Sequence, residues 1–239
     1  RHSSSAASDV YKRQGYYNEE LDISLETNDE VERYPIQLYH HLCIQTELKD
    51  KIIVEVGSGR GGGANFIARY HSPKLITGVD LSPNAISLCK NNYNLNNLNF
   101  IIGDSANLPF DDNSVEVVVN VESSHCYPSI PDFISEVCRV LKPGGHFLYC
   151  DLLIESTLDD HLNKLKNNSL KDFQHVDITE NIIKASELMT DDRNKIINKV
   201  NSSFLRKVLK SFASVKGSKI YKSFVDRHYR YVSLVAEKK

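Results

Sequence analysis

Short apolar runs alternate with segments of helical spacing through the middle of the chain. Runs of strand character cover residues 51–56, 75–79, 100–102, 115–121 and 146–150. Between these runs, apolar residues recur every third or fourth position, as at Phe133, Val137 and Leu141, which is typical of an amphipathic helix. Alternation of strands and helices over 51–151 predicts an α/β fold with a doubly wound, mostly parallel sheet.

The flanks of this block have different patterns. Upstream, residues 30–48 have helical spacing. Downstream we expect a polar helix at 155–168, a strand at 172–178, helix over 180–214 with a break near Thr190, and a final strand at 229–236. The whole pattern predicts one domain over 15–239 with a seven-stranded sheet. Its core is 51–151, and a helical cap over the ligand edge, at about 155–215, is inserted before the last strand.

A glycine-rich turn follows the first core strand. The segment Val54-Glu55-Val56-Gly57-Ser58-Gly59-Arg60-Gly61-Gly62-Gly63 leads from a strand into a helix, so a ligand can approach bare backbone amides. Gly57-x-Gly59-x-x-Gly62 matches the dinucleotide fingerprint. Read from Glu55 to Gly61, the same turn matches the nucleoside-binding turn of S-adenosylmethionine (SAM) methyltransferases. The third interpretation is an ordinary glycine-rich loop.

Polar residues stand where the predicted strands end. Gly57, Asp80, Asp104, Glu122 and Asp151 each follow one of the apolar runs. In doubly wound sheets, ligands bind outside the carboxyl ends of the strands. We therefore expect these residues at the ligand site.

Composition is that of a globular protein, with 41% hydrophobic and 25% charged residues and no apolar run near the roughly 18 residues of a membrane span. The five cysteines are scattered and form no C-x-x-C pair, which favours reduced thiols and a cytoplasmic location. Neither cysteine nor histidine spacing predicts a metal site. Asp9 to Gln14 resemble the translated end of a transposon used to prepare sequencing libraries, and we expect residues 1–14 to be a non-native scar.

Charge is unevenly distributed although the net charge is only −2. From Arg193 to Lys239 there are 13 Lys and Arg against two acids. Such a segment suggests contact with a membrane surface or an acidic carrier, and a solvated helix face is the simpler alternative. Overall acidity argues against a nucleic-acid substrate.

The chain resembles the core of class I SAM-dependent methyltransferases. The matching features are the turn at 55–61, Asp80, Gly103-Asp104-Ser105-Ala106 and Leu141-Lys142-Pro143-Gly144-Gly145. More narrowly, the chain resembles the phthiotriol/phenolphthiocerol dimycocerosate O-methyltransferase-like family. The segments that carry this resemblance are Ile36-Gln37-Leu38-Tyr39-His40-His41, Gly61-Gly62-Gly63, Asn120-Val121-Glu122-Ser123-Ser124-His125-Cys126-Tyr127-Pro128 and Phe212-Ala213-x-Val215-x-Gly217-Ser218.

The resemblance implies a SAM site. Gly57 and Gly59 would admit the cofactor to the backbone, Glu55 would anchor its ammonium, Asp80 would accept from both ribose hydroxyls, and Asp104 would accept from the adenine amino group. The full set of expected cofactor residues is Glu55, Gly57, Ser58, Gly59, Asp80, Leu81, Asp104, Ser105, Ala106 and Asn120.

His125 follows the fourth strand, and its ordinary pKa range suits a general base. We expect His125 to be that base, with Glu122 orienting it or contacting substrate; a hydrogen-bonded loop histidine is the alternative. The expected activity is O-methylation of a hydroxyl on a hydrophobic lipid, polyketide or phenolic acceptor. Alternatives are a C-methyltransferase of the quinone or sterol type, an NAD(P)-binding oxidoreductase and a non-catalytic SAM-binding protein.

Overall fold

The structure is a computed structural model that describes residues 14–200, 202, 206 and 215–239. The expected scar at 1–14 lies outside these residues except for Gln14. Part of the expected cap, at 201, 203–205 and 207–214, also lies outside them.

The chain divides into two compact units. The sheet unit consists of Leu42–Asp177 and Tyr231–Lys239, and the helical unit consists of the described residues up to His41 together with those of Ile178–Arg230. Residues 155–177, which we expected in the cap, therefore belong to the sheet unit.

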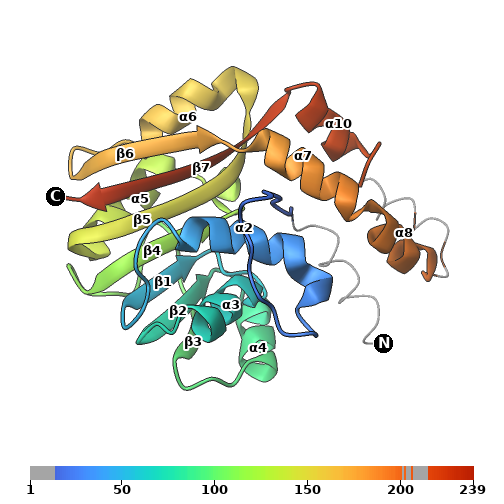
Figure 1. Cartoon of the computed structure of the whole chain (residues 1–239). Helices are drawn as coiled ribbons and strands as arrows, with labels where there is room; N and C mark the ends of the chain where they lie inside the picture. The colour runs from blue at the N-terminus through green and yellow to red at the C-terminus, as the bar shows by residue number, and fades with distance from the viewer. Residues whose placement is uncertain (1–13, 201, 203–205, 207–214) are drawn as a thin grey trace. The chain divides into compact units, whose positions relative to one another are not determined.

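Seven strands form one sheet in the order β3-β2-β1-β4-β5-β7-β6, which runs from bottom to top in Figure 1. The strands are β1 (Ile52–Val56), β2 (Leu75–Asp80), β3 (Leu98–Ile102), β4 (Val115–Val121), β5 (Leu141–Ile154), β6 (Leu170–Asp177) and β7 (Tyr229–Lys238). The pairs from β3 to β5 are parallel, and β7 is antiparallel to β6. The predicted mostly parallel, doubly wound sheet is confirmed.

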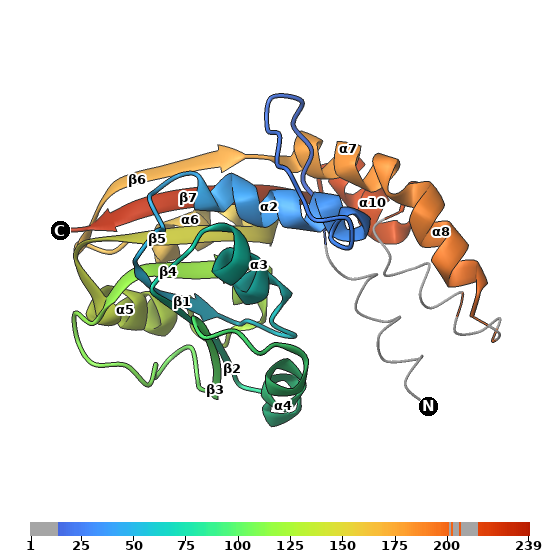
Figure 2. The same ribbon diagram turned by 60° about the horizontal axis from the view of Figure 1, so that its bottom comes forward.

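Helices cover both faces of the sheet in the sheet unit. As Figures 1 and 2 show, α3 (Gly62–Tyr70) and α4 (Pro83–Asn92) lie on one face, and α5 (Ile130–Val140) and α6 (Leu158–Leu165) lie on the other. Local chemistry starts α4 where the sequence predicted it: the Ser82 side chain accepts from Ala85 N, and Pro83 occupies the first turn.

One hydrophobic core cluster lies between α5 and the central strands. Phe133, Val137 and Val140 of α5 are fully buried in one cluster with Val118 of β4 and Phe147 of β5. Burial of one such side chain contributes about 1.5–3 kcal/mol. This packing holds β4 and β5 side by side, and residues at the ends of both strands build the site described below.

The bounds of the fifth strand differ most from the prediction. The sequence predicted a helix ended by Lys142-Pro143-Gly144-Gly145, then a strand that stops before Asp151. In the structure α5 ends at Val140 and β5 already begins at Leu141, because Val115 of β4 pairs with Leu141. β5 continues to Ile154, so Asp151 lies inside the strand.

The helical unit contains η1 (Glu30–Glu32), α7 (Thr179–Leu188), α8 (Thr190–Asn198) and α10 (Lys219–Val225), and α2 (Arg33–Cys43) begins in it. The predicted break near Thr190 separates α7 from α8. The segment before η1 is tied to α7, because Asn181 Nδ2 donates to Tyr17 O at 2.9 Å. Among the described residues, no helix combines the length and the apolar character that a membrane crossing requires.

Candidate active site

A cavity of about 410 Å³ opens at the carboxyl ends of β1, β2 and β4 in the sheet unit. This is the edge where a doubly wound sheet binds its ligand. Its lining includes six of the ten residues expected to bind cofactor: Gly57, Gly59, Asp80, Leu81, Asp104 and Ser105. Glu122 lines it as well.

The glycine turn presents backbone to this cavity. Gly57 and Gly59 have φ of 76° and 53°, in the left-handed region that favours glycine. The turn is held against β2, because Gly57 N and Ser58 N both donate to Val79 O at 2.8 and 2.9 Å. A Cβ added at Gly59 would have no heavy atom within 4 Å, so the space beside this residue is open to a ligand.

Asp80 joins the end of β2 to the glycine turn. Its Oδ2 accepts from Gly59 N at 2.8 Å, and its Oδ1 accepts from Ser82 N at 2.9 Å. Each oxygen keeps a second lone pair, so the fixed carboxylate can still accept from a ligand hydroxyl. Asp104 is fixed in a similar way, since its Oδ1 accepts from Ala106 N at 2.9 Å.

The other four expected cofactor residues, Glu55, Ser58, Ala106 and Asn120, do not line the cavity. Glu55 and Asn120 are fully buried in the strands. Asn120 supports the site from behind, because its Nδ2 lies 3.0 Å from Val56 O, 2.8 Å from Ser123 Oγ and 2.9 Å from Tyr127 OH.

That hydroxyl cluster closes one side of the glycine turn. Ser123 Oγ and Tyr127 OH lie 3.0 Å apart, and both residues line the cavity. A Cβ added at Gly57 would come within 2.4 Å of Ser123 and 2.8 Å of Tyr127 OH. Burial raises the pKa of Tyr127, so this phenol stays protonated.

His125 lies next to this wall, on the short helix η2 (Ser124–Cys126) that follows β4. Its Nδ1 lies 2.6 Å from Oδ1 of Asp151, whose side chain has no exposed surface, whereas the His125 side chain is 36% exposed. The hydrogen bond to Asp151 raises the pKa of His125 against the opposing effect of its partial burial. His125 does not itself line the cavity, but Ser123, Cys126 and Tyr127 do.

The pairing of β4 with β5 explains why Asp151 meets His125. Val121 is aligned with Cys150, and Glu122 N donates to Cys150 O at 2.9 Å, so the chain leaves β4 beside Asp151. The hydrogen bond that orients His125 therefore comes from Asp151. Glu122, which we expected in that role or as a substrate contact, adopts φ of 51°, lines the cavity and raises the pKa of His125 through its charge.

The cavity is acidic. Asp80, Asp104 and Glu122 are its charged residues, and no Lys or Arg stands among the described residues that line it. A dinucleotide pyrophosphate would meet repulsion here, whereas SAM carries a positive sulfonium and an ammonium group. The open space beside Gly59 and the fixed carboxylates of Asp80 and Asp104 also fit SAM. Within the described part of the chain, no group of three His, Cys, Asp or Glu side chains could hold a metal ion.

Comparison with known proteins leads to the same cofactor. A family profile described as "Methyltransferase domain" matches residues 54–149. Among solved structures, a putative sarcosine dimethylglycine methyltransferase from Galdieria sulphuraria superposes with a TM-score of 0.76 at 15% identity, covering 95% of this chain and 93% of that one. Geranyl diphosphate C-methyltransferase from Streptomyces coelicolor A3(2), solved with S-adenosyl-L-homocysteine, gives a TM-score of 0.67 at 17% identity over 95% and 91% of the two chains. The protein is a SAM-dependent methyltransferase with a Rossmann-like fold.

Curated relatives define the family. Phthiotriol/phenolphthiotriol dimycocerosates methyltransferase from Mycobacterium leprae is 36% identical over 200 residues, which cover 84% of this chain and 74% of the relative. A fatty-acid O-methyltransferase from Mycolicibacterium smegmatis is 35% identical over 208 residues, with 87% and 76% coverage. The chain belongs to the phthiotriol/phenolphthiotriol dimycocerosates methyltransferase family. This decides the earlier choice between a dinucleotide turn and a SAM turn in favour of SAM.

Proposed function

We propose that this enzyme methylates the oxygen of a hydroxyl group on a hydrophobic acceptor of the lipid, polyketide or phenolic class, with His125 as general base. The observation that carries the proposal is the hydrogen bond between His125 Nδ1 and the buried carboxylate of Asp151, on a loop whose neighbouring residues line the cofactor cavity.

An alcohol or phenol must lose its proton when its oxygen takes up a methyl group. SAM supplies that methyl group on a sulfonium sulfur. Because Asp151 is a carboxylate that can only accept, His125 donates from Nδ1, and its Nε2 keeps the lone pair that takes the acceptor's proton. The charge of Asp151 then stabilises the imidazolium that forms.

The cavity residues hold the cofactor in this proposal. Backbone at Gly57 and Gly59 would hold the methionine part, Asp80 would accept from the ribose hydroxyls and Asp104 would accept from the adenine amino group. Glu122 would supply negative charge that suits the sulfonium. Glu55, Ser58, Ala106 and Asn120 act behind this surface by fixing the turn and the loop.

The presence of a general base at His125 also helps to choose between a hydroxyl and a carboxylate as the methyl acceptor. The name of one relative states that it acts on fatty acids, and those of others name phthiotriol and phenolphthiotriol dimycocerosates. A fatty-acid carboxylate is already ionised at neutral pH and needs no base, whereas a hydroxyl does. A built His125–Asp151 pair therefore supports a hydroxyl acceptor over a carboxylate.

Labelled SAM with three matched long-chain acceptors tests the proposal: 4-dodecylphenol, hexadecanol and palmitic acid. We expect ether products from the phenol or the alcohol and a loss of about 100-fold in their turnover in His125→Ala, within the range that a positioned base contributes. Methyl ester from palmitic acid alone, or unchanged hydroxyl turnover in His125→Ala, would contradict it. Treatment of the product with hydriodic acid separates the two product types, because it releases the labelled methyl group of an ether as methyl iodide and leaves a C-methylated product intact.

We further propose that the enzyme works in the cytoplasm at a membrane or carrier surface. All five cysteines are free thiols, and Cys126 is exposed beside the cavity, which suits a reducing compartment. The basic segment from Arg193 to Lys239 would meet the anionic surface. Flotation with vesicles that contain about 30% anionic lipid, compared with neutral vesicles, tests this; equal recovery with both would count against it.

A further inference from the structure

Beyond Asp151, side-chain hydrogen bonds continue through the sheet unit to helix α6. Ser124 Oγ lies 2.6 Å from Asp151 Oδ2 and 2.9 Å from Tyr149 OH. Tyr149 OH lies 3.0 Å from Nε2 of His161 on α6. Ser124, Tyr149 and Asp151 are essentially without exposed surface, so no bulk water competes with these bonds.

The direction of each bond follows from the number of protons available. Asp151 is a carboxylate and can only accept, so the single proton of Ser124 is donated to it. Ser124 must then accept from Tyr149, and the hydroxyl of Tyr149 has no second proton to donate. Tyr149 in turn accepts from His161, which must carry its proton on Nε2. Burial lowers the pKa of His161, so the ring is neutral with Nδ1 as its acceptor.

All donors in this chain therefore point toward Asp151. The carboxylate accepts from Ser124 Oγ and from His125 Nδ1. It also accepts from the backbone N–H groups of His125 and Leu152 at 3.0 and 2.8 Å. Four donors compensate for burying the charge, and they leave the carboxylate one orientation. A chain with this polarity does not carry a proton from His125 to α6, because each hydroxyl would first have to reverse its bond.

We propose that Tyr149 and His161 are positioning residues for methyl transfer. Through Ser124 they hold Asp151 in the orientation that fixes the ring of His125. Neither residue lines the cofactor cavity, and both act only through the His125–Asp151 pair. The inference rests on the proposed role of His125 as base.

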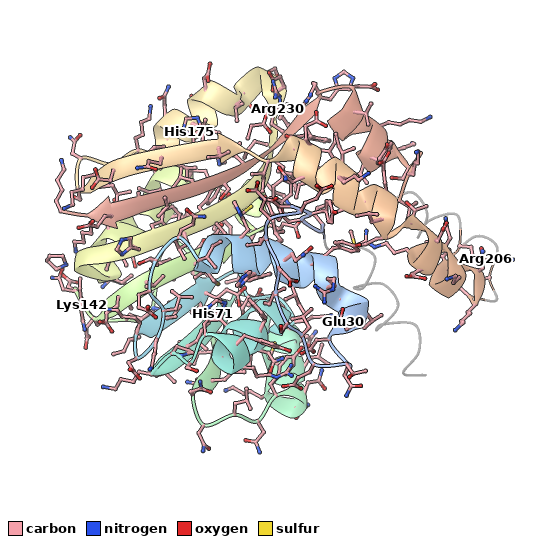
Figure 3. All side chains as sticks on the ribbon, viewed as in Figure 1. Glu30, His71, Lys142, His175, Arg206 and Arg230 are labelled. Carbon is pink, nitrogen blue, oxygen red and sulfur yellow. The ribbon has the colours of Figure 1, made fainter. Side chains whose placement is uncertain are left out.

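A double-mutant cycle tests the inference with methyl-labelled SAM and 4-dodecylphenol as probe. In the otherwise unchanged enzyme, we expect His161→Ala or Tyr149→Phe to lower kcat about tenfold with little change in the KM for SAM, because the base is displaced. His161→Gln can still donate to Tyr149 and should recover most of the loss. In a His125→Ala background, His161→Ala should cost less than twofold. His175→Ala removes an exposed histidine on the edge strand β6, labelled in Figure 3, and is the matched control.

The outcomes separate the inference from the function on which it rests. If His125→Ala does not change turnover, the proposed base is wrong. If His125→Ala lowers turnover but His161→Ala does not, or if the two losses multiply in the double mutant, the positioning role is wrong. Nitrogen-15 NMR of labelled histidine gives a readout without turnover: we expect His161 as the Nε2–H tautomer, and an Nδ1–H tautomer would overturn the inference.

Discussion

His125 Nδ1 lies 2.6 Å from Oδ1 of Asp151. His125 is in the loop that follows β4, and Asp151 is in β5, the neighbouring parallel strand. The hydrogen bond that His125 donates to this buried carboxylate raises the pKa of His125. Since only neutral His125 can take a proton, hydroxyl methylation should fall as the pH drops through a pKa above 6.5. Asp151→Asn removes the charge, so the acid inflection of kcat should move to lower pH while turnover above it falls. An inflection unmoved by Asp151→Asn would show that another group titrates.

The same pKa direction has a consequence for stability. A folded pKa above the unfolded value means that protonated His125 stabilises the fold. This contribution is present below the unfolded pKa and is lost as the pH rises through the folded one. The loss of Tm caused by His125→Gln should therefore be larger at about pH 6 than at about pH 9. Thermal unfolding of the unchanged protein and the variant at both values measures it.

Two glycines of the same turn should respond differently to alanine. At Gly59 the added methyl enters open space, so the fold loses only the cost of a left-handed alanine, about 1–2 kcal/mol, while the methyl obstructs the cofactor. At Gly57 the methyl also meets Ser123 and Tyr127 OH at 2.4 and 2.8 Å, so the loss should exceed about 2 kcal/mol. Denaturant unfolding and calorimetric titration with S-adenosylhomocysteine measure the two effects. Equal destabilisation by both variants would contradict the packing at Gly57.

Asp80→Asn should weaken cofactor binding without unfolding the sheet. Both oxygens of Asp80 accept from backbone N–H groups. In the asparagine variant an NH₂ group replaces one of these oxygens, so that NH₂ group faces a backbone N–H and one hydrogen bond is lost. Together with the lost charge toward the ribose hydroxyls, this should weaken S-adenosylhomocysteine about 10- to 100-fold. Asp111→Asn, an exposed aspartate away from the cavity, is the control. Calorimetric titration checks the difference, and similar affinity in both variants would remove Asp80 from the site.

Strands β1, β2 and β4 were predictable because each is a nearly continuous apolar run. Val115–Val121 was predicted with its observed bounds, since five of its seven residues are valine and six of them are buried between two helix layers. The start of β5 was not predictable in this way: Leu141–Gly145 reads as a helix end, and only its pairing with β4 makes it a strand. The grouping of 14–41 with 178–230 also depends on contacts between segments far apart in sequence.

For the site, the polar residues at strand ends were informative. Asp80, Asp104 and Glu122 all reach the cavity, because the carboxyl ends of neighbouring parallel strands share one edge. Sequence spacing alone could not decide whether Glu122 or Asp151 forms the hydrogen bond with His125. That choice depends on the register of β4 against β5 and on the turn of the backbone at Glu122, where φ is positive. Tyr149 and His161 belong to no recognisable motif, so the sequence did not indicate that they contact the site.

Arg139 of α5 should support the cofactor site from a distance. Its guanidinium donates to Leu108 O and Phe110 O at 2.8 and 2.7 Å, and it forms a two-point bond with Glu136. Glu136 Oε2 also accepts from Leu108 N at 2.7 Å, so the pair clamps the loop that follows Asp104 and Ser105.

Arg139→Lys keeps the charge but cannot reproduce this planar fork. We expect a loss of about 1–3 kcal/mol in unfolding free energy, because the two loop carbonyls lose a charged donor. Affinity for S-adenosylhomocysteine should fall less than in Asp80→Asn, since only the wall beside the adenine loosens. Arg227→Lys, at an exposed ion pair with Glu180, should cost under about 1 kcal/mol and leave affinity unchanged. If calorimetry and denaturant unfolding gave the same values for both arginine variants, the clamp would have no role in the site.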